Sequence, residues 1–145
     1  MNNLSIVIIT GLSGAGKSHA AKVFEDLGYY TIDNVPLPIL EKVVELFYSL
    51  DNGITKVAFV IDSRAKDINL VYQFIKMLKE KYNATSIFMD ASSETLIKRY
   101  KETRRKHPLG SDVPESIKKE ITLMGNVKDI SDIVLNTDNV ESQGL

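Results

Sequence analysis

The sequence predicts an α/β fold, a parallel sheet of five strands with helices on both faces, from three observations. Short apolar runs rich in β-branched residues alternate with longer amphipathic stretches of helical period, which is typical of repeated βαβ units. A glycine-rich motif follows the first apolar run. Acidic residues, Asp33 and Asp62, close the second and third runs. Because ligands of such sheets bind at the carboxyl ends of the strands, we expect the functional residues to gather there.

The glycine-rich motif predicts a phosphate-binding loop. It reads Gly11-Leu12-Ser13-Gly14-Ala15-Gly16-Lys17-Ser18 and fits the pattern G-x-x-x-x-G-K-[ST]. Glycines allow successive N–H groups to point inward around a polyphosphate, and the following helix adds its positive N-terminal dipole. Lys17 would reach the β- and γ-phosphates, and the Ser18 hydroxyl would ligate Mg²⁺. A glycine-rich turn with a chance lysine is the alternative, but the position between a strand and a helix favours a kinase-like P-loop NTPase fold.

The first βαβ unit is predicted from residues 4–33. Residues 4–10 are apolar without alternation, as expected of a central parallel strand covered on both faces. A helix over 17–27 follows, which Gly28 ends, and a second strand spans 29–33. The apolar positions expected on the buried face of this helix are Ala20, Ala21, Val23, Phe24 and Leu27.

The second helix is opened by Pro36 and Pro38, since proline is tolerated in a first turn. Its amphipathic stripe comprises Leu40, Val43, Val44 and Phe47. A turn at Asn52-Gly53 leads to a buried third strand over 57–61. The helix over 67–82 then directs Ile68, Val71, Tyr72, Ile75 and Leu78 inward.

The last third of the chain predicts two strands and two helices. A fourth strand over 85–89 precedes a helix over 93–102 and a polar stretch over 103–113. Ser111 or Asp112 would cap a further helix that ends near Met124, with proline and glutamate in its first turn. The final strand is expected over 130–135.

The composition indicates one domain over residues 1–145, with 43% hydrophobic and 26% charged residues. A net charge of −1 gives no global attraction to nucleic acid or to an anionic membrane. The absence of cysteine excludes disulfides and thiolate metal sites and suits a reducing compartment. With no leader and no apolar run of spanning length, we expect a cytoplasmic protein without membrane contact.

Two acids are candidate site residues. Asp62, at the end of the third strand, would hold Mg²⁺ together with Ser18, whereas the alternative is an ordinary helix cap or loop acid. Asp33 would lie near the γ-phosphate, where it could orient a water or bind an acceptor hydroxyl. A local Asx-turn is an equally open interpretation of Asp33.

The basic run over 98–107 contains six Lys or Arg residues and one acid. Arg104 and Arg105 leave the predicted helix for a loop with proline and glycine, a segment able to close over a site and stabilise charge on a transferring phosphoryl group. The alternatives are a solvated helix face and contact with RNA. Lys17, Asp33, Arg104 and Arg105 are therefore the candidate catalytic residues.

The chain also resembles the RapZ/YvcJ family of P-loop nucleotide-binding proteins, known as RNase adapter proteins. The resemblance is carried by the residues 11–18, 33–36 and 62–64 and by the Tyr-x-x-Thr-Arg-Arg-x-His-Pro-Leu string over 100–109. It implies ATP binding at 11–18, ATPase and GTPase activity, and a C-terminal domain linked to small-RNA binding, which would begin where this sequence ends. It implies guanine-nucleotide binding at Asp62, Ser63, Arg64 and Ala65.

Three functions compete at this stage. The first is a regulatory domain that binds and slowly hydrolyses ATP or GTP, with Mg²⁺ as cofactor and RNA contact mainly through the C-terminal domain. The second is a small-molecule or nucleoside-monophosphate kinase, which shares the layout of a short P-loop domain with an arginine-bearing lid. The third is an RNA-binding module that uses the basic run. Base selectivity stays open, because Ala65 stands where the family has Ser or Asn and no Asn-Lys-x-Asp element is present.

Overall fold

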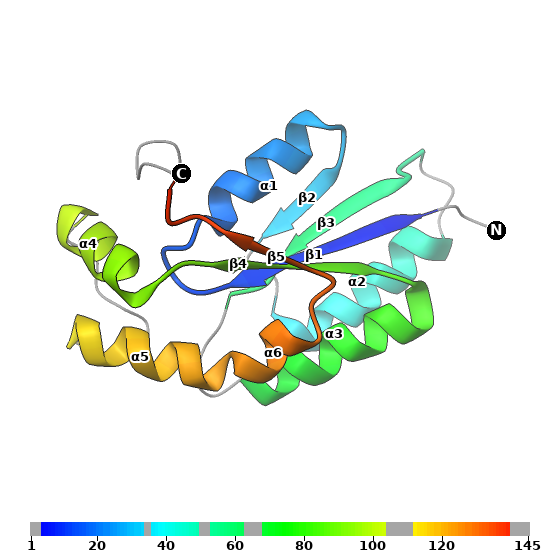
Figure 1. The fold of residues 1–145 in the computed structure, drawn as a ribbon. Helices are drawn as coiled ribbons and strands as arrows, with labels where there is room; N and C mark the ends of the chain where they lie inside the picture. The colour runs from blue at the N-terminus through cyan, green and yellow to red at the C-terminus, as the bar shows by residue number, and fades with distance from the viewer. Residues whose placement is uncertain (1–3, 34–35, 50–52, 63–67, 104–111, 140–145) are drawn as a thin grey trace.

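The computed structural model describes residues 4–33, 36–49, 53–62, 68–103 and 112–139. Within them the chain forms a parallel sheet of five strands in the order β2-β3-β1-β4-β5 (Figure 1). The strands are β1 (Ser5–Gly11), β2 (Tyr30–Asp33), β3 (Lys56–Val60), β4 (Thr85–Asp90) and β5 (Ile133–Asn136). The helices are α1 (Lys17–Asp26), α2 (Leu37–Ser49), α3 (Ile68–Tyr82), α4 (Ser93–Thr103), α5 (Val113–Leu123) and α6 (Gly125–Asp129). The predicted fold class is confirmed.

The first strand occupies the centre of the sheet. β1 pairs with β3 on one side, with Ile9 opposite Val60, and with β4 on the other, with Ile9 opposite Ile87. Residues Ile6 to Gly11 are buried, as the apolar sequence without alternation predicts for a strand covered on both faces. All carboxyl ends point to the same side, where the loop after β1, helix α4 and the start of α5 lie (Figure 1).

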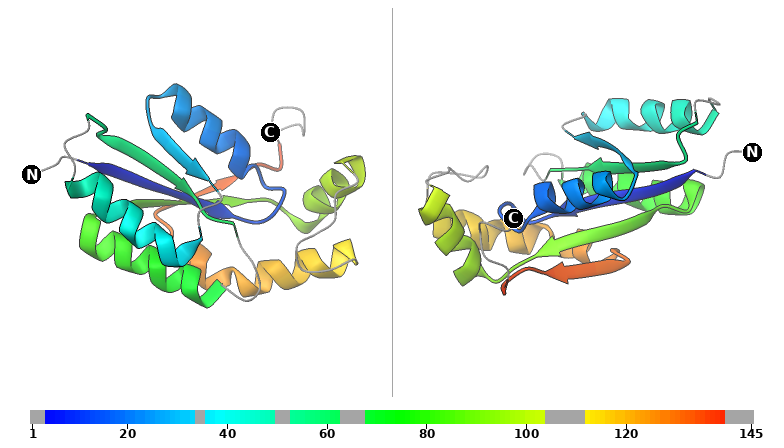
Figure 2. Two further views of the ribbon diagram at one scale, coloured as in Figure 1. Left: turned by 180° about the vertical axis from the view of Figure 1, so that it is seen from behind. Right: turned by 90° about the horizontal axis from the view of Figure 1, so that it is seen from above.

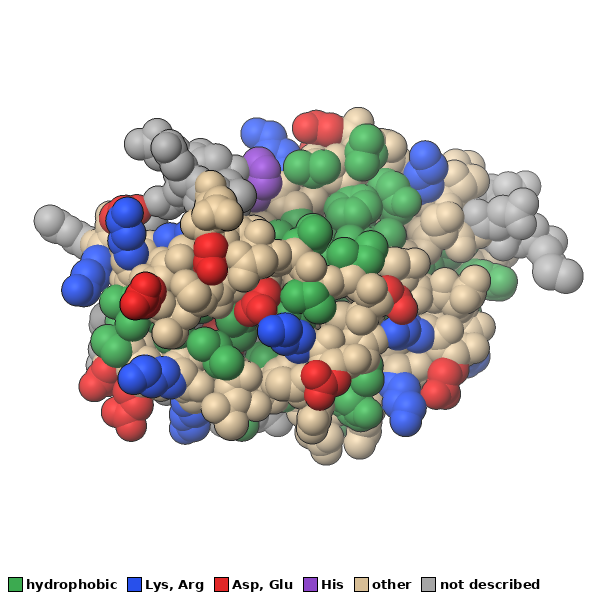
Figure 3. All heavy atoms as spheres, in the orientation of Figure 1, with side chains coloured by type: hydrophobic (Ala, Val, Ile, Leu, Met, Phe, Trp, Pro, Cys, Tyr) green, Lys and Arg blue, Asp and Glu red, His purple; other side chains and the backbone are tan. Residues whose placement is uncertain are grey.

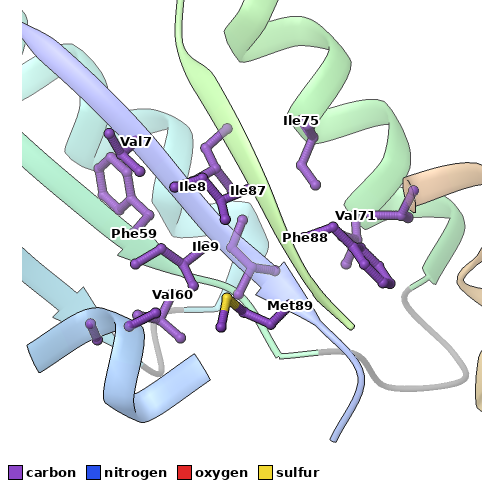
Figure 4. Packing of buried hydrophobic residues seen from close by; sticks show 14 of the residues in the cluster. Val7, Ile8, Ile9, Phe59, Val60, Val71, Ile75, Ile87, Phe88 and Met89 are labelled. Atoms are coloured by element: carbon purple, nitrogen blue, oxygen red, sulfur yellow. The ribbon is translucent and has the colours of Figure 1, made fainter. Parts of the chain in front are cut away.

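Helices cover both faces of this sheet. α1 lies on one face, against β1, β2 and β3, while α2, α3 and α6 lie on the other (Figures 1 and 2). The stripes predicted for α2 and α3 are confirmed, with Leu40, Val44, Val71 and Ile75 buried. Figure 4 shows Phe88 of β4 extending toward Val71 and Ile75. Burial of such side chains is the main favourable term that holds the layers together.

The buried face of α1 is narrower than the sequence predicts. Ala20 and Ala21 are buried and Phe24 is partly buried, but Val23 is 43% exposed and Leu27 is 60% exposed. Two alanines directed at the sheet fill little space, so the apolar positions at the edge of the stripe remain at the surface. The predicted inward orientation of Val23 and Leu27 is wrong.

The end of the chain also differs from the expectation. Asp112 is the N-cap of α5, because its side chain accepts a hydrogen bond from the Glu115 N–H at 3.2 Å, and this confirms one of the two predicted caps. The predicted last strand, however, begins at Ile133 rather than at residue 130. The residues before it form the short helix α6, in which Val127 is buried and which packs on α3.

Residue Asp132 attaches β5 to the sheet. Its carboxylate accepts a hydrogen bond from the Ser86 N–H at 2.8 Å and lies 3.1 Å from the Lys79 ammonium. Burial alone would raise the pKa of Asp132, but the bonds from Ser86 and Lys79 outweigh it and lower the pKa below its ordinary value. β5 itself is an edge strand, and all four of its residues are exposed rather than buried like those of β1.

Acidic and basic side chains are interspersed on the face shown in Figure 3, in keeping with a net charge of −1. Among the helices that the structure describes, none combines the length and apolar character needed to span a bilayer.

Candidate phosphate-binding site

The loop between β1 and α1 has the backbone of a phosphate-binding loop. Gly11, Gly14 and Gly16 have φ values of +141°, +88° and +109°, a region that residues with a side chain rarely adopt. The Leu12 N–H donates to the Met89 carbonyl at 3.0 Å, and the Ala15 N–H donates to the Leu12 carbonyl at 3.0 Å. Gly16 has no side chain, and no side-chain hydrogen bond caps the first turn of α1.

The ammonium group of Lys17 lies in the mouth of this loop. Lys17 is 8% exposed, and its Nζ donates to the carbonyls of Gly11 at 3.1 Å and Leu12 at 3.3 Å. The same Nζ is 3.7 Å from the Asp62 carboxylate, whose side chain is 50% exposed. A positive charge is therefore held beside the first turn of α1, where two carbonyls and a carboxylate offset its burial.

The sheet places Asp62 where the sequence predicts it. The Ile61 N–H donates to the Ile9 carbonyl at 2.9 Å, which extends the pairing of β1 and β3 and brings Asp62 to the level of the loop. Ser18, its predicted partner on Mg²⁺, is exposed on the first turn of α1. In the part of the chain that the structure describes, no group of three or more His, Cys, Asp or Glu is arranged to hold a metal ion. A hydroxyl and a carboxylate are nevertheless hard oxygen donors that fit Mg²⁺, which usually keeps several waters and phosphate oxygens as ligands.

Asp33 lies farther from the loop than Asp62 does. It ends β2 and is exposed, and it pairs with Val60, which in turn pairs with Ile9 of β1. The backbone of Asp33 therefore lies two strand spacings, about 10 Å, from the backbone of Ile9 in β1. The remaining predicted site residues, Ser63, Arg64, Ala65, Arg104 and Arg105, lie outside the described residues.

Three residues that the sequence analysis did not assign to the site bind the outer side of the loop. Glu120 of α5, which is 1% exposed, accepts hydrogen bonds from the Ser13 N–H and the Ser13 hydroxyl, both at 2.9 Å. Arg99 of α4 donates to the Gly14 carbonyl and to the Thr137 hydroxyl oxygen, both at 3.0 Å. The Thr137 hydroxyl donates to the Ala15 carbonyl at 2.8 Å.

These contacts change the interpretation of the basic run over 98–107. Arg99 is 6% exposed and is turned toward the loop, so it is not part of a solvated or RNA-facing surface. Burial lowers the pKa of the Arg99 guanidinium, and the charges of Asp138 and Glu102 oppose that shift. The guanidinium still remains protonated at neutral pH, as arginine does in proteins. Lys98 and Lys101 are exposed.

A sequence signal for Glu120 was available. It occupies the same stripe of α5 as Ile117 and Met124, both of which are fully buried, at spacings of three and four residues. A carboxylate in an apolar stripe requires a partner, since an unpaired buried charge is costly. Arg99 gave no comparable signal, because the charged residues around it predict a solvated helix face, and Thr137 lies in no amphipathic stripe.

The loop, the central strand and the sheet order together define a P-loop protein of the kinase-like fold. Solved structures support that class: a shikimate kinase from Acinetobacter baumannii in complex with shikimate aligns with a TM-score of 0.61 at 16% identity, covering 97% of this chain and 87% of that one. A sugar kinase from Janibacter sp. HTCC2649 also aligns with a TM-score of 0.61, at 19% identity, covering 97% and 88%. At these identities the likeness concerns the fold alone.

Within this class, the chain belongs to the family described as the RapZ-like N-terminal domain, which matches residues 4–145. A nucleotide-binding protein from Thermotoga petrophila is 42% identical over 143 residues, covering 97% of this chain and 50% of that protein. A nucleotide-binding protein from Clostridioides difficile (strain 630) is 39% identical over 146 residues, covering 98% and 51%. The chain thus spans about half the length of the curated relatives it matches, and the resemblance found from the sequence is confirmed.

Proposed function

We propose that this chain binds a nucleoside triphosphate, ATP or GTP, with its phosphates on the loop over 11–18. The observation that carries the proposal is the Lys17 ammonium, which is held in the loop 3.7 Å from the Asp62 carboxylate and beside the uncapped first turn of α1. Relatives at 39–42% identity that are named nucleotide-binding proteins support the same assignment.

Each part of the site has a defined task in this proposal. The N–H groups of the loop and of the first turn of α1 donate to phosphate oxygens, and the helix dipole adds to their attraction. Lys17 keeps its carbonyl partners, Gly11 and Leu12, and also donates to phosphate oxygens, which carry more negative charge. Ser18 and Asp62 hold Mg²⁺, which neutralises charge on the phosphates when it is bound.

We further propose that the bound nucleotide is hydrolysed slowly and that the domain is regulatory. Asp33 is exposed at the carboxyl edge of the sheet, on the side of β3 away from the loop, and is the candidate for orienting a water. Arg104 and Arg105 are the candidates for stabilising the transferring phosphoryl group. RNA contact is assigned mainly to the C-terminal region that family members carry, because Arg99 of the basic run is buried and cannot contact RNA.

A small-molecule or nucleoside-monophosphate kinase is the second candidate. The observation that favours it is the superposition on kinases over 97% of the chain. An acceptor hydroxyl would then take the position assigned above to a water, near Asp33. A kinase should consume nucleotide much faster with one acceptor than without, whereas a regulatory hydrolase should show the same slow rate with every acceptor tested.

Isothermal titration calorimetry tests the common core of both candidates. ATP, GTP and their non-hydrolysable analogues are titrated with and without Mg²⁺ into the wild type, Lys17→Ala and Lys22→Ala. Lys22 is exposed on the same helix, so its variant removes the same charge without touching the loop. We expect tight binding to be lost only in Lys17→Ala, which should keep a weak, measurable affinity, and unchanged affinity in folded Lys17→Ala would overturn the site.

A further inference from the structure

Glu120 has an unusual environment for a carboxylate. It lies in the apolar stripe of α5 between Ile117 and Met124 and is 1% exposed. Both of its oxygens accept hydrogen bonds from Ser13, one from the N–H and one from the hydroxyl. An apolar side chain of the same size would fill this position without the desolvation penalty of a charge. The carboxylate therefore indicates a role beyond packing.

The bond from the Ser13 N–H fixes the orientation of one peptide in the phosphate loop. All peptide bonds that the structure describes are trans, and a trans peptide directs its N–H and its carbonyl to opposite sides. Because the Ser13 N–H points outward to Glu120, the Leu12 carbonyl of the same peptide points inward. That carbonyl accepts hydrogen bonds from the Lys17 Nζ at 3.3 Å and from the Ala15 N–H at 3.0 Å. Glu120 and Lys17 thus act on opposite ends of a single peptide unit.

We propose that Glu120 is a positioning residue of the phosphate site. It orients the Leu12–Ser13 peptide, and that peptide sets the position of the Lys17 ammonium. The nucleotide affinity therefore depends on a residue of helix α5. This inference rests on the proposed function, since it assigns Glu120 to the same site. The hydroxyl bond of Ser13 is secondary, because only the N–H belongs to the peptide that faces Lys17.

The decisive variant is Glu120→Leu, which fits the apolar stripe but accepts no hydrogen bond. We expect its unfolding temperature to stay close to that of the wild type, because removal of a buried charge offsets the loss of the acceptor for Ser13, which is only half-buried. Its triphosphate Kd should rise about tenfold, the effect expected from losing one hydrogen bond to a charged group. A purely structural Glu120 would instead lose stability and affinity together, and that result would overturn the proposal.

Three matched variants sharpen the test. Glu120→Gln retains an acceptor for the Ser13 N–H and should keep nearly all of the affinity. Ser13→Ala removes only the secondary hydroxyl bond and should therefore cost less affinity than Glu120→Leu. Glu115→Gln changes the same residue type at an exposed position of α5 and should have no effect. A loss in Glu120→Gln and Ser13→Ala equal to that in Glu120→Leu would contradict the peptide-orientation argument.

A double-mutant cycle identifies the route of the effect. In a Lys17→Ala background Glu120→Leu should change the Kd by about twofold or less, because the group on which Glu120 acts is gone. The same tenfold change in both backgrounds would refute action through Lys17.

Amide hydrogen exchange of Ser13, measured by NMR without nucleotide, separates this inference from the proposed function. The amide proton of residue 13 should exchange faster in Glu120→Leu and remain slow in Ser13→Ala. An unaltered exchange rate in Glu120→Leu would refute the contact. If the wild type bound no triphosphate while Ser13 exchange still responded to Glu120, the proposed function would fail and the contact would stand.

Discussion

Gly11 makes the strictest demand on backbone geometry in the phosphate loop. Its φ of +141° is rarely adopted by residues with a side chain. A Cβ added there would lie 2.2 Å from the carbonyl oxygen and 2.6 Å from the nitrogen of Met89, both backbone atoms of the neighbouring strand β4. The Gly11→Ala variant must therefore strain its own backbone and also push β1 and β4 apart.

The magnitude follows from these two terms. Backbone strain in such a region costs about 1–3 kcal/mol. Forcing an extra methyl group against packed backbone costs about 1–3 kcal/mol more. We expect Gly11→Ala to lower the free energy of unfolding by about 2–6 kcal/mol, a large part of the roughly 5–15 kcal/mol available to a domain.

Gly28 provides the matched control. It has φ of +94°, but a Cβ added there meets nothing within 4 Å. Gly28→Ala should therefore cost only the conformational strain, about 1–2 kcal/mol. Urea unfolding followed by circular dichroism measures both variants, with the wild type as reference. If Gly11→Ala were no more destabilising than Gly28→Ala, the close approach of the loop to Met89 would be refuted.

Three further predictions concern the site and the sheet. Ser18→Ala and Asp62→Asn should each weaken the Mg²⁺ dependence of triphosphate binding in calorimetry, with a coupling of at least about 0.5 kcal/mol, whereas additive effects would make Asp62 only a loop acid. Arg99→Lys should lower stability by about 1–3 kcal/mol in thermal unfolding, because lysine cannot reproduce the forked bonds to Gly14 and Thr137. Lys98→Ala at the exposed neighbour should stay within about 0.5 kcal/mol, and similar losses in both would contradict the role of Arg99. The pKa of Asp132 is lowered in the folded state, so its stabilising contribution is complete above about pH 4 and is lost as the pH falls through the folded-state pKa. Asp132→Asn should therefore reduce the fall of the unfolding temperature at acid pH. An unchanged pH profile of the unfolding temperature would refute this role.

The sequence predicts the sheet well because its signals are local. The strands β1 and β3 contain uninterrupted apolar runs over 6–9 and 57–60, and the loop motif fixes the position of α1 within a residue. Asp62 was predicted as an acid that ends a buried strand, and the pairing of β3 with β1, which the sequence analysis did not specify, brings it to the loop. Its predicted joint role with Ser18 on Mg²⁺ stays a prediction.

The errors arise where neighbouring elements decide the outcome. The local sequence around Ile130 does not exclude a strand. Because α6 packs on α3, however, β5 begins only at Ile133. The outward-facing Val23 and Leu27 depend on how much of α1 the sheet covers. The contacts of Glu120 with Ser13 join residues 107 positions apart, so no local pattern specifies the pair.

The contacts on the outer side of the loop have a consequence for folding. The loop is complete by residue 18, but Arg99, Glu120 and Thr137, which bond to it, are synthesised much later. Contacts at separations of 85 to 122 residues carry a high contact order and form late, because the intervening chain must be ordered first. On a ribosome, the loop would therefore acquire its rigid form only after Thr137 has left the exit tunnel. A ligand that binds only the finished loop adds RT ln(1 + [L]/Kd) to the stability of the folded domain. It therefore stabilises only those chains in which the contacts of the loop with Arg99, Glu120 and Thr137 have formed.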